Sequence, residues 1–263
     1  MLTTEFVTGS PNWLELRSPD TAVAATFYAQ VFGWDFQPAY PRGRYGFFIR
    51  DGRMVAALGP HLEPGTAPAW TVYFQSPDVE ATAGAVEKSG GEVRIEPRDV
   101  VDLGRMACLA DPSGAQFAVW QPARLAGLDE VDAEATLCWL ELRTDDPGGA
   151  ERFYRPLFGW AAADYRTPDA SYRTLSAGDG TQAAAGRMFG EIATARAGEP
   201  VHWEPYFRLA DVDALAARVV SYGGRLLAGP EDVPGVGRVC GVADPQGASF
   251  SVLGVAGPGP SQD

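Results

Sequence analysis

The chain contains 263 residues, of which 46% are hydrophobic and 21% are charged. These fractions are typical of folded domains and exclude disorder over the bulk of the chain. The formal net charge of −13 argues against nucleic acid and anionic membranes as partners, because both carry the same sign of charge. We therefore expect a folded protein, long enough for two domains, that binds neither nucleic acid nor membranes.

The cysteines and the N-terminal segment indicate the compartment. Cys108, Cys138 and Cys240 form no CxxC pair and leave an odd number, which is typical of a reduced, intracellular protein. The first residues, MLTTEFVTGSPNW, lack the basic and apolar regions of a secretion signal, and no run of about 18 apolar residues follows. We expect a cytoplasmic protein.

The first unit of the chain reads as a strand, a helix and further strands. Residues 13–17 alternate as a strand does, Asp20 can cap the helix that follows, and Gly33 suits the left-handed position after its last turn. Two more strands, at 45–50 and 54–58, flank a tight Asp-Gly turn.

The second unit repeats this order. Residues 70–75 form its first strand, and Asp78 caps a helix that ends at Gly90 and Gly91. The turn at 111–114 joins the closing strands. The first half therefore holds two βαβββ units.

The second half repeats the first. WLELRSPD at 13–20 recurs as WLELRTDD at 139–146. FYAQVFGW at 27–34 recurs as FYRPLFGW at 153–160. A repeat of this length indicates a tandem duplication, so the whole chain contains four βαβββ units.

The spacing between the halves grows along the chain. ADPSGAQF at 110–117 matches ADPQGASF at 243–250, seven residues further apart than the earlier pairs, so we expect an insertion around 161–200. The acidic stretch with proline and glycine between the halves has the composition of an exposed linker. The predicted parts are a first domain at 9–121, a linker at 122–135 and a second domain at 136–255.

Four such units, with the FYAQVFGW and DPSGAQF motifs in these places, resemble the vicinal oxygen chelate superfamily of glyoxalases, bleomycin resistance proteins and extradiol dioxygenases. The resemblance extends from Pro11 to Val255. It implies an α+β fold in which paired units form two tandem cups, with helices on the convex side and the ligand in the cup. Fold alone does not give the reaction, because the family holds both enzymes and drug-sequestering proteins.

The same resemblance implies four metal-ligand positions in each cup, filled in most of the family's enzymes by His or Gln and by Glu. Of the residues at these positions only Glu204 is a good ligand, and a pair with His202 would hold a metal weakly. We therefore expect no metal and no cofactor. The mapped positions are Trp13, Thr71, Ala118 and residues 55–58 in the first cup, and Trp139, Glu204, Ser251 and residues 183–186 in the second.

Strand alternation predicts which side chains face the cups. The set combines aromatic residues with polar groups, as small-molecule pockets do. The alternative is that Trp13 and Trp139 fill the cups as core residues. The predicted ligand-binding residues are Trp13, Arg17, Thr71, Tyr73, Gln75 and Trp120 in the first cup, and Trp139, Arg143, Glu204, Tyr206 and Arg208 in the second.

Glu15 and Glu141 are the candidate catalytic residues. A carboxylate beside an indole in a dry cup has its pKa raised, which suits it to general acid or base work near neutral pH. The alternative is an inert ion pair with Arg17 or Arg143 on the same strand. Arg105 and Arg238, on neighbouring strands, are the other possible partners.

Three functions remain open. The first, which we prefer, is a metal-free protein that binds a hydrophobic or aromatic metabolite or antibiotic. The second is a metal-independent enzyme of natural-product metabolism, such as a cyclase, an epimerase or a hydroxylase-like protein, with Glu15 or Glu141 as acid or base and Tyr73 or Tyr206 polarising a carbonyl. The third is a metal-dependent lyase or dioxygenase. We expect a monomer, with a homodimer as the alternative.

Overall fold

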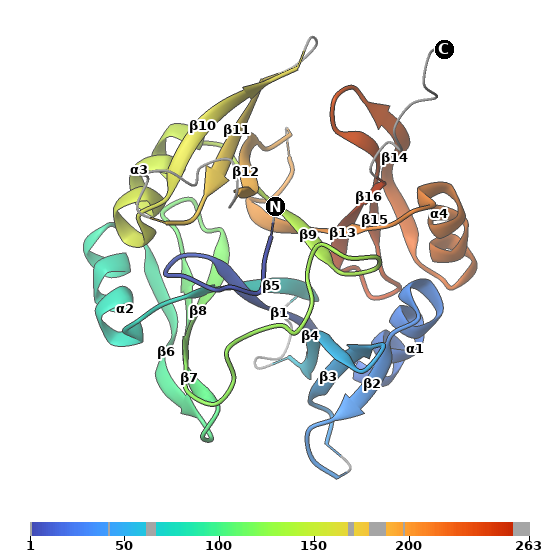
Figure 1. Cartoon of the computed structure of the whole chain (residues 1–263), viewed down its shortest axis with the longest axis horizontal. Helices are drawn as coiled ribbons and strands as arrows, with labels where there is room; N and C mark the ends of the chain where they lie inside the picture. Colours follow the sequence, from blue (N-terminus) through green and yellow to red (C-terminus); the bar gives the residue numbers. More distant parts are fainter. Residues whose placement is uncertain are drawn as a thin grey trace.

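The structure is a computed structural model that describes residues 2–41, 43–61, 67–167, 171–178, 188–196 and 198–254. Its strands form two eight-stranded sheets, one for each half of the chain (Figure 1). Within the described residues, no helix is long and apolar enough to cross a membrane.

The first sheet has the order β2-β3-β4-β1-β5-β8-β7-β6. Its two inner strands, β1 and β5, run antiparallel, and each pairs in parallel with the last strand of its own unit. The elements are β1 (Pro11–Ser18), α1 (Thr21–Phe32), β2 (Asp35–Pro38), β3 (Gly46–Arg50), β4 (Arg53–Pro60), β5 (Ala69–Gln75), α2 (Val79–Lys88), β6 (Glu92–Val100), β7 (Gly104–Ala110) and β8 (Gln116–Pro122).

The second sheet repeats this arrangement, with the order β10-β11-β12-β9-β13-β16-β15-β14. The predicted α+β fold of four βαβββ units is confirmed. The elements are β9 (Leu137–Thr144), α3 (Pro147–Phe158), β10 (Ala161–Arg166), β11 (Ser171–Ser176), β12 (Met188–Thr194), β13 (His202–Arg208), α4 (Val212–Ser221), β14 (Arg225–Val233), β15 (Gly237–Ala243) and β16 (Ser249–Gly254).

The last strand of the third unit lies later than predicted. The sequence placed its ligand position at 183–186, which lies outside the described residues. The strand that pairs with β9 is β12, and it brings Glu191 opposite Glu141. The insertion places β12 later in the chain than the repeat predicts. The alanine-rich sequence at 183–186, just before β12, resembles the alanine-rich strand at 55–58, so the sequence pattern favours it in place of β12.

The helices begin and end where the sequence predicted. The carboxylates of Asp20 and Asp78 accept backbone N–H groups of the first helical turns, and Asp146 does the same for α3. Gly33 and Gly159 close α1 and α3 in the left-handed conformation.

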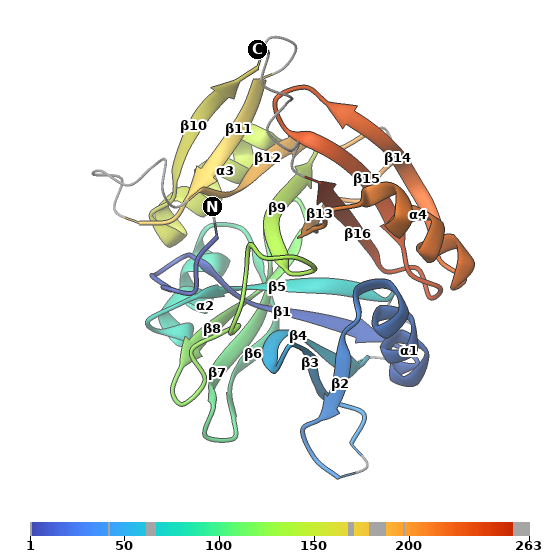
Figure 2. The same ribbon diagram turned by 45° about the vertical axis from the view of Figure 1, so that its right-hand side comes forward.

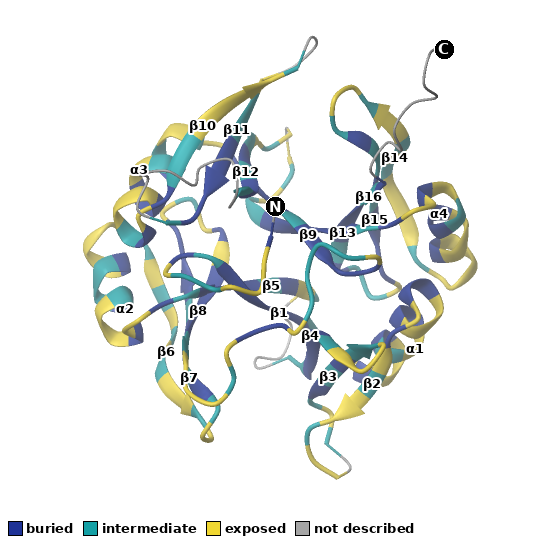
Figure 3. Cartoon of the chain, viewed as in Figure 1, coloured by how far each residue is buried: buried dark blue, intermediate teal, exposed yellow. Residues whose placement is uncertain are grey.

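The two halves share one aromatic core, and Figure 2 shows the two sheets side by side with helices beside their junction. The ring of Phe32 lies 5.0 Å from that of Phe207, and Phe74 lies 4.9 Å from Trp160. These contacts join each unit of the first half to a unit of the second half. The burial colours of Figure 3 place the buried residues on the strands and on the inner sides of the helices.

A reciprocal set of hydrogen bonds crosses this core. Tyr154 donates to Asp111 at 3.1 Å, and Tyr28 donates to Asp244 at 3.4 Å. Each tyrosine also accepts a bond from an indole, of Trp203 or Trp70, at 3.1 and 3.2 Å. The duplicated ADP turns therefore hold the helices of the opposite half.

The segment between the halves is exposed in part but is anchored to the core at several points. Leu128 and Ala135 are buried, and the carbonyl of Ala135 accepts the indole N–H of Trp34 at 3.0 Å. The equivalent bond of the other half runs from Trp160 to the carbonyl of Gly9 at 2.7 Å. Composition predicts an exposed linker, and residues 122–124 are exposed, but the end of the segment is buried because its carbonyl bonds an indole of the core.

We predict that Gly9→Ala destabilises the protein by about 2–4 kcal/mol. Gly9 has a φ of 77°, and a Cβ there would lie 2.7 Å from Cβ of Phe158 and 2.8 Å from the indole nitrogen of Trp160. Urea denaturation of parent and variant measures the difference.

Gly52→Ala is the matched control. Its φ is also 77°, but a Cβ would meet nothing within 4 Å, so only the backbone strain of about 1 kcal/mol is expected. Equal losses in the two variants would contradict the close packing at Gly9.

Candidate functional site

A buried glutamate, arginine and tyrosine meet in the first cup. Glu15 and Arg17 project from β1, and the side chain of Tyr73 reaches them from β5. Tyr73 Oη donates to Glu15 Oε2 at 2.9 Å, and Arg17 Nε pairs with Glu15 Oε1. The ion pair predicted between Glu15 and Arg17 is thus present.

Glu15 is 2% exposed, and this burial raises its pKa. The charge of Arg17 and the hydrogen bond from Tyr73 work in the opposite direction, because both stabilise the ionised form. Burial is the larger effect. A proton on this carboxyl is therefore held more tightly than on a free glutamate.

Apolar side chains and aromatic rings surround these groups. Trp13 is buried and meets the ring of Phe47 edge-on, with centroids 6.0 Å apart. Ala57 lies opposite Glu15 on β4, and Ala118 lies opposite Tyr73 on β8. Neither alanine offers a ligand to a metal.

Glycine at position 59 lets three groups approach each other. A Cβ there would lie 2.8 Å from the ring of Tyr45 and 2.9 Å from Nη1 of Arg17. The guanidinium carbon of Arg17 stands 5.9 Å from the centre of that ring. A side chain on Gly59 would push Arg17 away from Glu15.

Other predicted residues of the first cup are held by the segments that flank the sheet. The indole of Trp120 donates to the carbonyl of Leu125 at 2.8 Å, and Gln75 donates to the carbonyl of Phe6 at 3.3 Å. Thr71 is half-buried opposite Glu15 on β5. These bonds keep Trp120 and Gln75 in place at the side of the cup.

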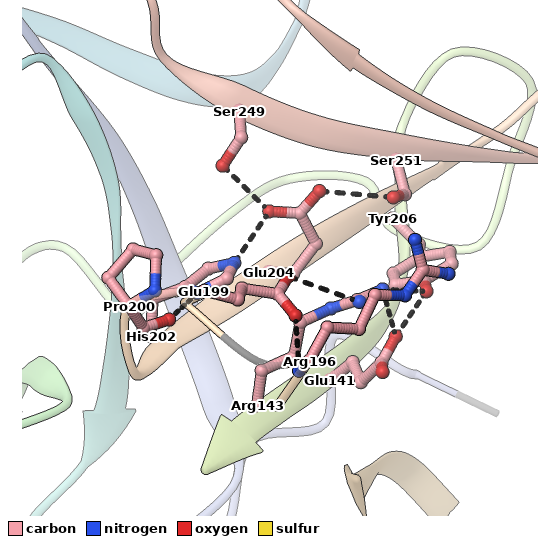
Figure 4. A network of polar contacts seen from close by, with 10 residues as sticks. All are labelled: Glu141, Arg143, Arg196, Glu199, Pro200, His202, Glu204, Tyr206, Ser249 and Ser251. Carbon is pink, nitrogen blue, oxygen red and sulfur yellow. Dashed lines mark hydrogen bonds and ion pairs between the residues drawn. The ribbon is translucent and has the colours of Figure 1, made fainter. Parts of the chain in front are cut away.

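The second cup repeats this triad of glutamate, arginine and tyrosine with Glu141, Arg143 and Tyr206, as Figure 4 shows. Arg143 Nη2 lies 3.1 Å from Glu141 Oε2, and Tyr206 donates to the same oxygen. Arg143 also pairs with Glu199 at 3.2 Å. Glu141 is buried, whereas Trp139 beside it is only half-buried.

Further polar groups distinguish the second cup. Glu204 accepts hydrogen bonds from Ser249 at 2.9 Å and Ser251 at 3.0 Å, and its Oε2 lies 3.2 Å from Nε2 of His202 (Figure 4). Burial lowers the pKa of His202, but its bonds to Glu204 and to the carbonyl of Pro200 outweigh this and raise it.

Glu191 is the site residue that the sequence analysis missed. It faces Glu141 across β12 and β9, and Glu204 faces Glu141 from the other side. Burial and the charge of Glu141 raise the pKa of Glu191 to about 7, although a hydrogen bond from Trp139 favours its ionised form. Pairing β12 with β9 in the parallel register of the first half would have found it.

Three predicted arginines, Arg105, Arg238 and Arg208, pair with acidic residues outside the two triads. Arg105 pairs with Glu80 and Asp99, and Arg238 pairs with Asp213 and Asp232. The prediction that they are partners of Glu15 and Glu141 is wrong, because strand alternation turns them to the helix side of the sheets. The third, Arg208, donates to Asp132 in the segment between the halves at 3.1 Å.

The donor set does not fit a metal centre of the family type. In the ranges that the structure describes, no three or more His, Cys, Asp and Glu side chains are grouped to hold a metal ion. In the first cup the oxygens of Glu15 are taken by Arg17 and Tyr73. Cys108 lies two strands from Tyr73, opposite Ala118, and burial raises the pKa of its thiol to about 11, which disfavours the thiolate that binds metals. The oxygens of Glu204 are likewise taken, by Ser249, Ser251 and His202.

One cavity of about 610 Å³ lies outside both cups, beside the end of α3. Its walls include Arg155, Trp160 and Arg173. It contains none of the predicted site residues.

We predict that Glu191 makes the stability of the protein depend on pH. Its pKa of about 7 lies above that of an unfolded glutamate, so its contribution is complete below about pH 4 and is lost as the pH rises through 7. Relative to Glu191→Gln, the parent should lose about 1–3 kcal/mol between pH 5 and pH 8. Denaturant titrations at both values measure this. A difference that stays constant with pH would contradict it.

Comparison with known proteins agrees with the fold and covers nearly the whole chain. A model of the glyoxalase/bleomycin resistance protein/dioxygenase superfamily matches residues 10–119, and a glyoxalase-like domain model matches 139–253. The crystal structure of the 2,3-dioxygenase LapB from Pseudomonas sp. KL28 superposes with a TM-score of 0.62 at 16% identity, covering 97% of this chain and 96% of that one. The Mn(II)-bound glyoxalase from Novosphingobium aromaticivorans gives 0.61 at 17% identity, covering 93% and 82%. These two show the fold alone.

Two relatives are much closer in sequence. "Putative glyoxylase CFP32" of Mycobacterium bovis is 38% identical over 95% of this chain and 96% of its own length. "Anthracycline biosynthesis protein DauV" of Streptomyces sp. strain C5 is also 38% identical, over 95% and 94%. The chain is therefore a member of the glyoxalase/bleomycin resistance protein/dioxygenase superfamily, with two tandem domains.

Proposed function

We propose that the protein binds a hydrophobic or aromatic small molecule in its first cup and holds it without a metal. The observation that carries this is the wall of the cup. Trp13, Phe47 and Tyr45 stand around a single buried carboxylate, and alanines occupy the neighbouring strand positions. Flat rings of this kind stack on a planar ligand and bury its surface, and Glu15 with Arg17 sets its orientation.

The relatives support a ligand from natural-product metabolism. DauV and the similar DnrV of Streptomyces peucetius, which is 37% identical over 95% of this chain, are both named anthracycline biosynthesis proteins. The fused rings of an anthracycline present the flat, largely apolar surface that the first cup suits. We propose a planar aromatic compound of this kind as the ligand.

A metal-independent enzyme is the second candidate. Its support is Glu15, whose raised pKa and contact with Tyr73 suit it to move a proton at a carbon next to a ligand carbonyl. Glu141 and Tyr206 repeat the pair. The ion pair with Arg17 favours binding over proton transfer, because it also stabilises the ionised carboxylate. A metal-dependent lyase or dioxygenase ranks third, since the donor set is unsuited to a metal.

We also propose that the protein is a monomer, with a homodimer as the alternative. The aromatic contacts of Phe32 with Phe207 and of Phe74 with Trp203 let each half cover the apolar side of the other. A second copy is not needed for that.

We predict that Trp13→Ala weakens the binding of 1,4-dihydroxyanthraquinone, a planar probe, at least tenfold, as measured by equilibrium dialysis. Loss of the indole removes a stacking wall beside Glu15. Trp139→Ala, the equivalent change in the second cup, should alter the affinity less than about threefold. The reverse pattern would place the ligand in the second cup.

Glu15→Gln separates binding from catalysis. If the protein only binds, mass spectrometry should recover the bound anthraquinone unchanged after incubation with the parent and with the variant. Conversion by the parent that disappears in Glu15→Gln, while Arg17→Lys retains part of it, would instead establish the enzyme.

A further inference from the structure

The two cups carry opposite charges at one equivalent position. Arg98 on β6 lies opposite Met106, which lies opposite Trp120 across β7 and β8. In the second half the same register brings Glu231 opposite Val239 and, beyond it, Leu253. A charge has thus been reversed between the duplicated sheets.

Arg98 belongs to the concave face of its sheet. Its neighbour Asp99 lies opposite Arg105, which pairs with Glu80 at the start of α2, on the convex face. Since side chains alternate along a strand, Arg98 points the other way. It is exposed, and within the described ranges it forms no ion pair.

The field of Arg98 reaches the buried part of the first cup. Its positive charge lowers the pKa of Glu15 and also that of Cys108, although burial dominates both and leaves the pKa of Cys108 raised to about 11. Because Glu15 is already paired with Arg17, it leaves the positive charge of Arg98 unpaired among the residues that the structure describes.

The second cup has the opposite character at the same level. The positions that flank Glu15 on β4 and β5 hold Ala57 and Thr71. The positions that flank Glu141 hold Glu191 and Glu204. Together with Glu231, these carboxylates oppose the approach of an anion.

We propose that the first cup selects a planar aromatic ligand that carries an anionic group, a carboxylate or an acidic phenol, and that Arg98 pairs with this group at the edge of the cup. The second cup rejects the same ligand. The aromatic wall of Trp13 binds the rings, and Arg98 distinguishes the charged compound from its neutral analogue. This inference rests on the proposed function, because it needs the first cup to be a binding site.

The experiment compares two probes of the same shape, anthraquinone-2-carboxylate and anthraquinone-2-carboxamide. Isothermal titration calorimetry on the full chain measures both affinities. We expect the parent to bind the carboxylate about tenfold more tightly than the carboxamide, with a preference that shrinks as salt is added.

Arg98→Glu introduces the charge of the second cup, and Arg98→Met removes the charge alone. Arg98→Glu should lower the affinity for the carboxylate probe at least tenfold, and Arg98→Met should lower it about fivefold. The affinity for the carboxamide probe should change less than about threefold in both variants. Glu231→Arg is the matched control in the second cup and should leave both affinities in the first cup unchanged. Since Arg98 is exposed on an edge strand, these variants are expected to fold.

The outcomes separate the two proposals. In one outcome, both probes bind in a way that depends on Trp13, while Arg98→Glu changes their two affinities by the same factor. That result would overturn the charge selection and leave the proposed function standing. Binding of neither probe, or binding that ignores Trp13→Ala, would overturn both. Carboxylate binding that is lost in Arg143→Met instead of Arg98→Met would place the anion in the second cup and also contradict this inference.

Discussion

The burial of each half's first helix against the opposite half is the constraint on which the rest of the structure depends. Tyr28 and Tyr154 are fully buried, and each donates a hydrogen bond to the aspartate of the other half's ADP turn. Each tyrosine also accepts a bond from an indole on β5 or β13. Those inner strands carry Tyr73 and Tyr206 on their other face, so the shared core holds the back of both cups.

The two cups, held by this shared core, have the same buried triad but different residues around it. The triad of glutamate, arginine and tyrosine is present in both, in the same strand positions. Its surroundings differ, because Ala57 and Thr71 beside Glu15 correspond to Glu191 and Glu204 beside Glu141. A buried ion pair is worth retaining for the geometry it sets rather than for stability. Its neighbours then decide which ligand can approach, and they make the first cup apolar and the second cup acidic.

The sequence predicted the parts of this arrangement that follow from local pattern. Strand alternation brought Glu15 and Arg17 to one face, and the repeat located β1, β5 and their counterparts. It could not locate β12, because the insertion before it erased the spacing, and Glu191 was missed with it. The partners of Arg143 and Arg208 include Glu199 and Asp132, which lie in connecting segments whose paths are set by tertiary contacts. Arg105 and Arg238 were within reach of prediction, since alternation alone turns them away from the cups.

We propose that the first cup binds an organic molecule in place of a metal. Native mass spectrometry tests it most directly, on protein purified without chelators or nickel affinity and then mixed with one equivalent of 1,4-dihydroxyanthraquinone. We expect the mass of the chain with one anthraquinone and without a stoichiometric divalent metal, and the loss of that adduct in Trp13→Ala. One divalent metal ion per chain, retained through buffer exchange, would contradict it.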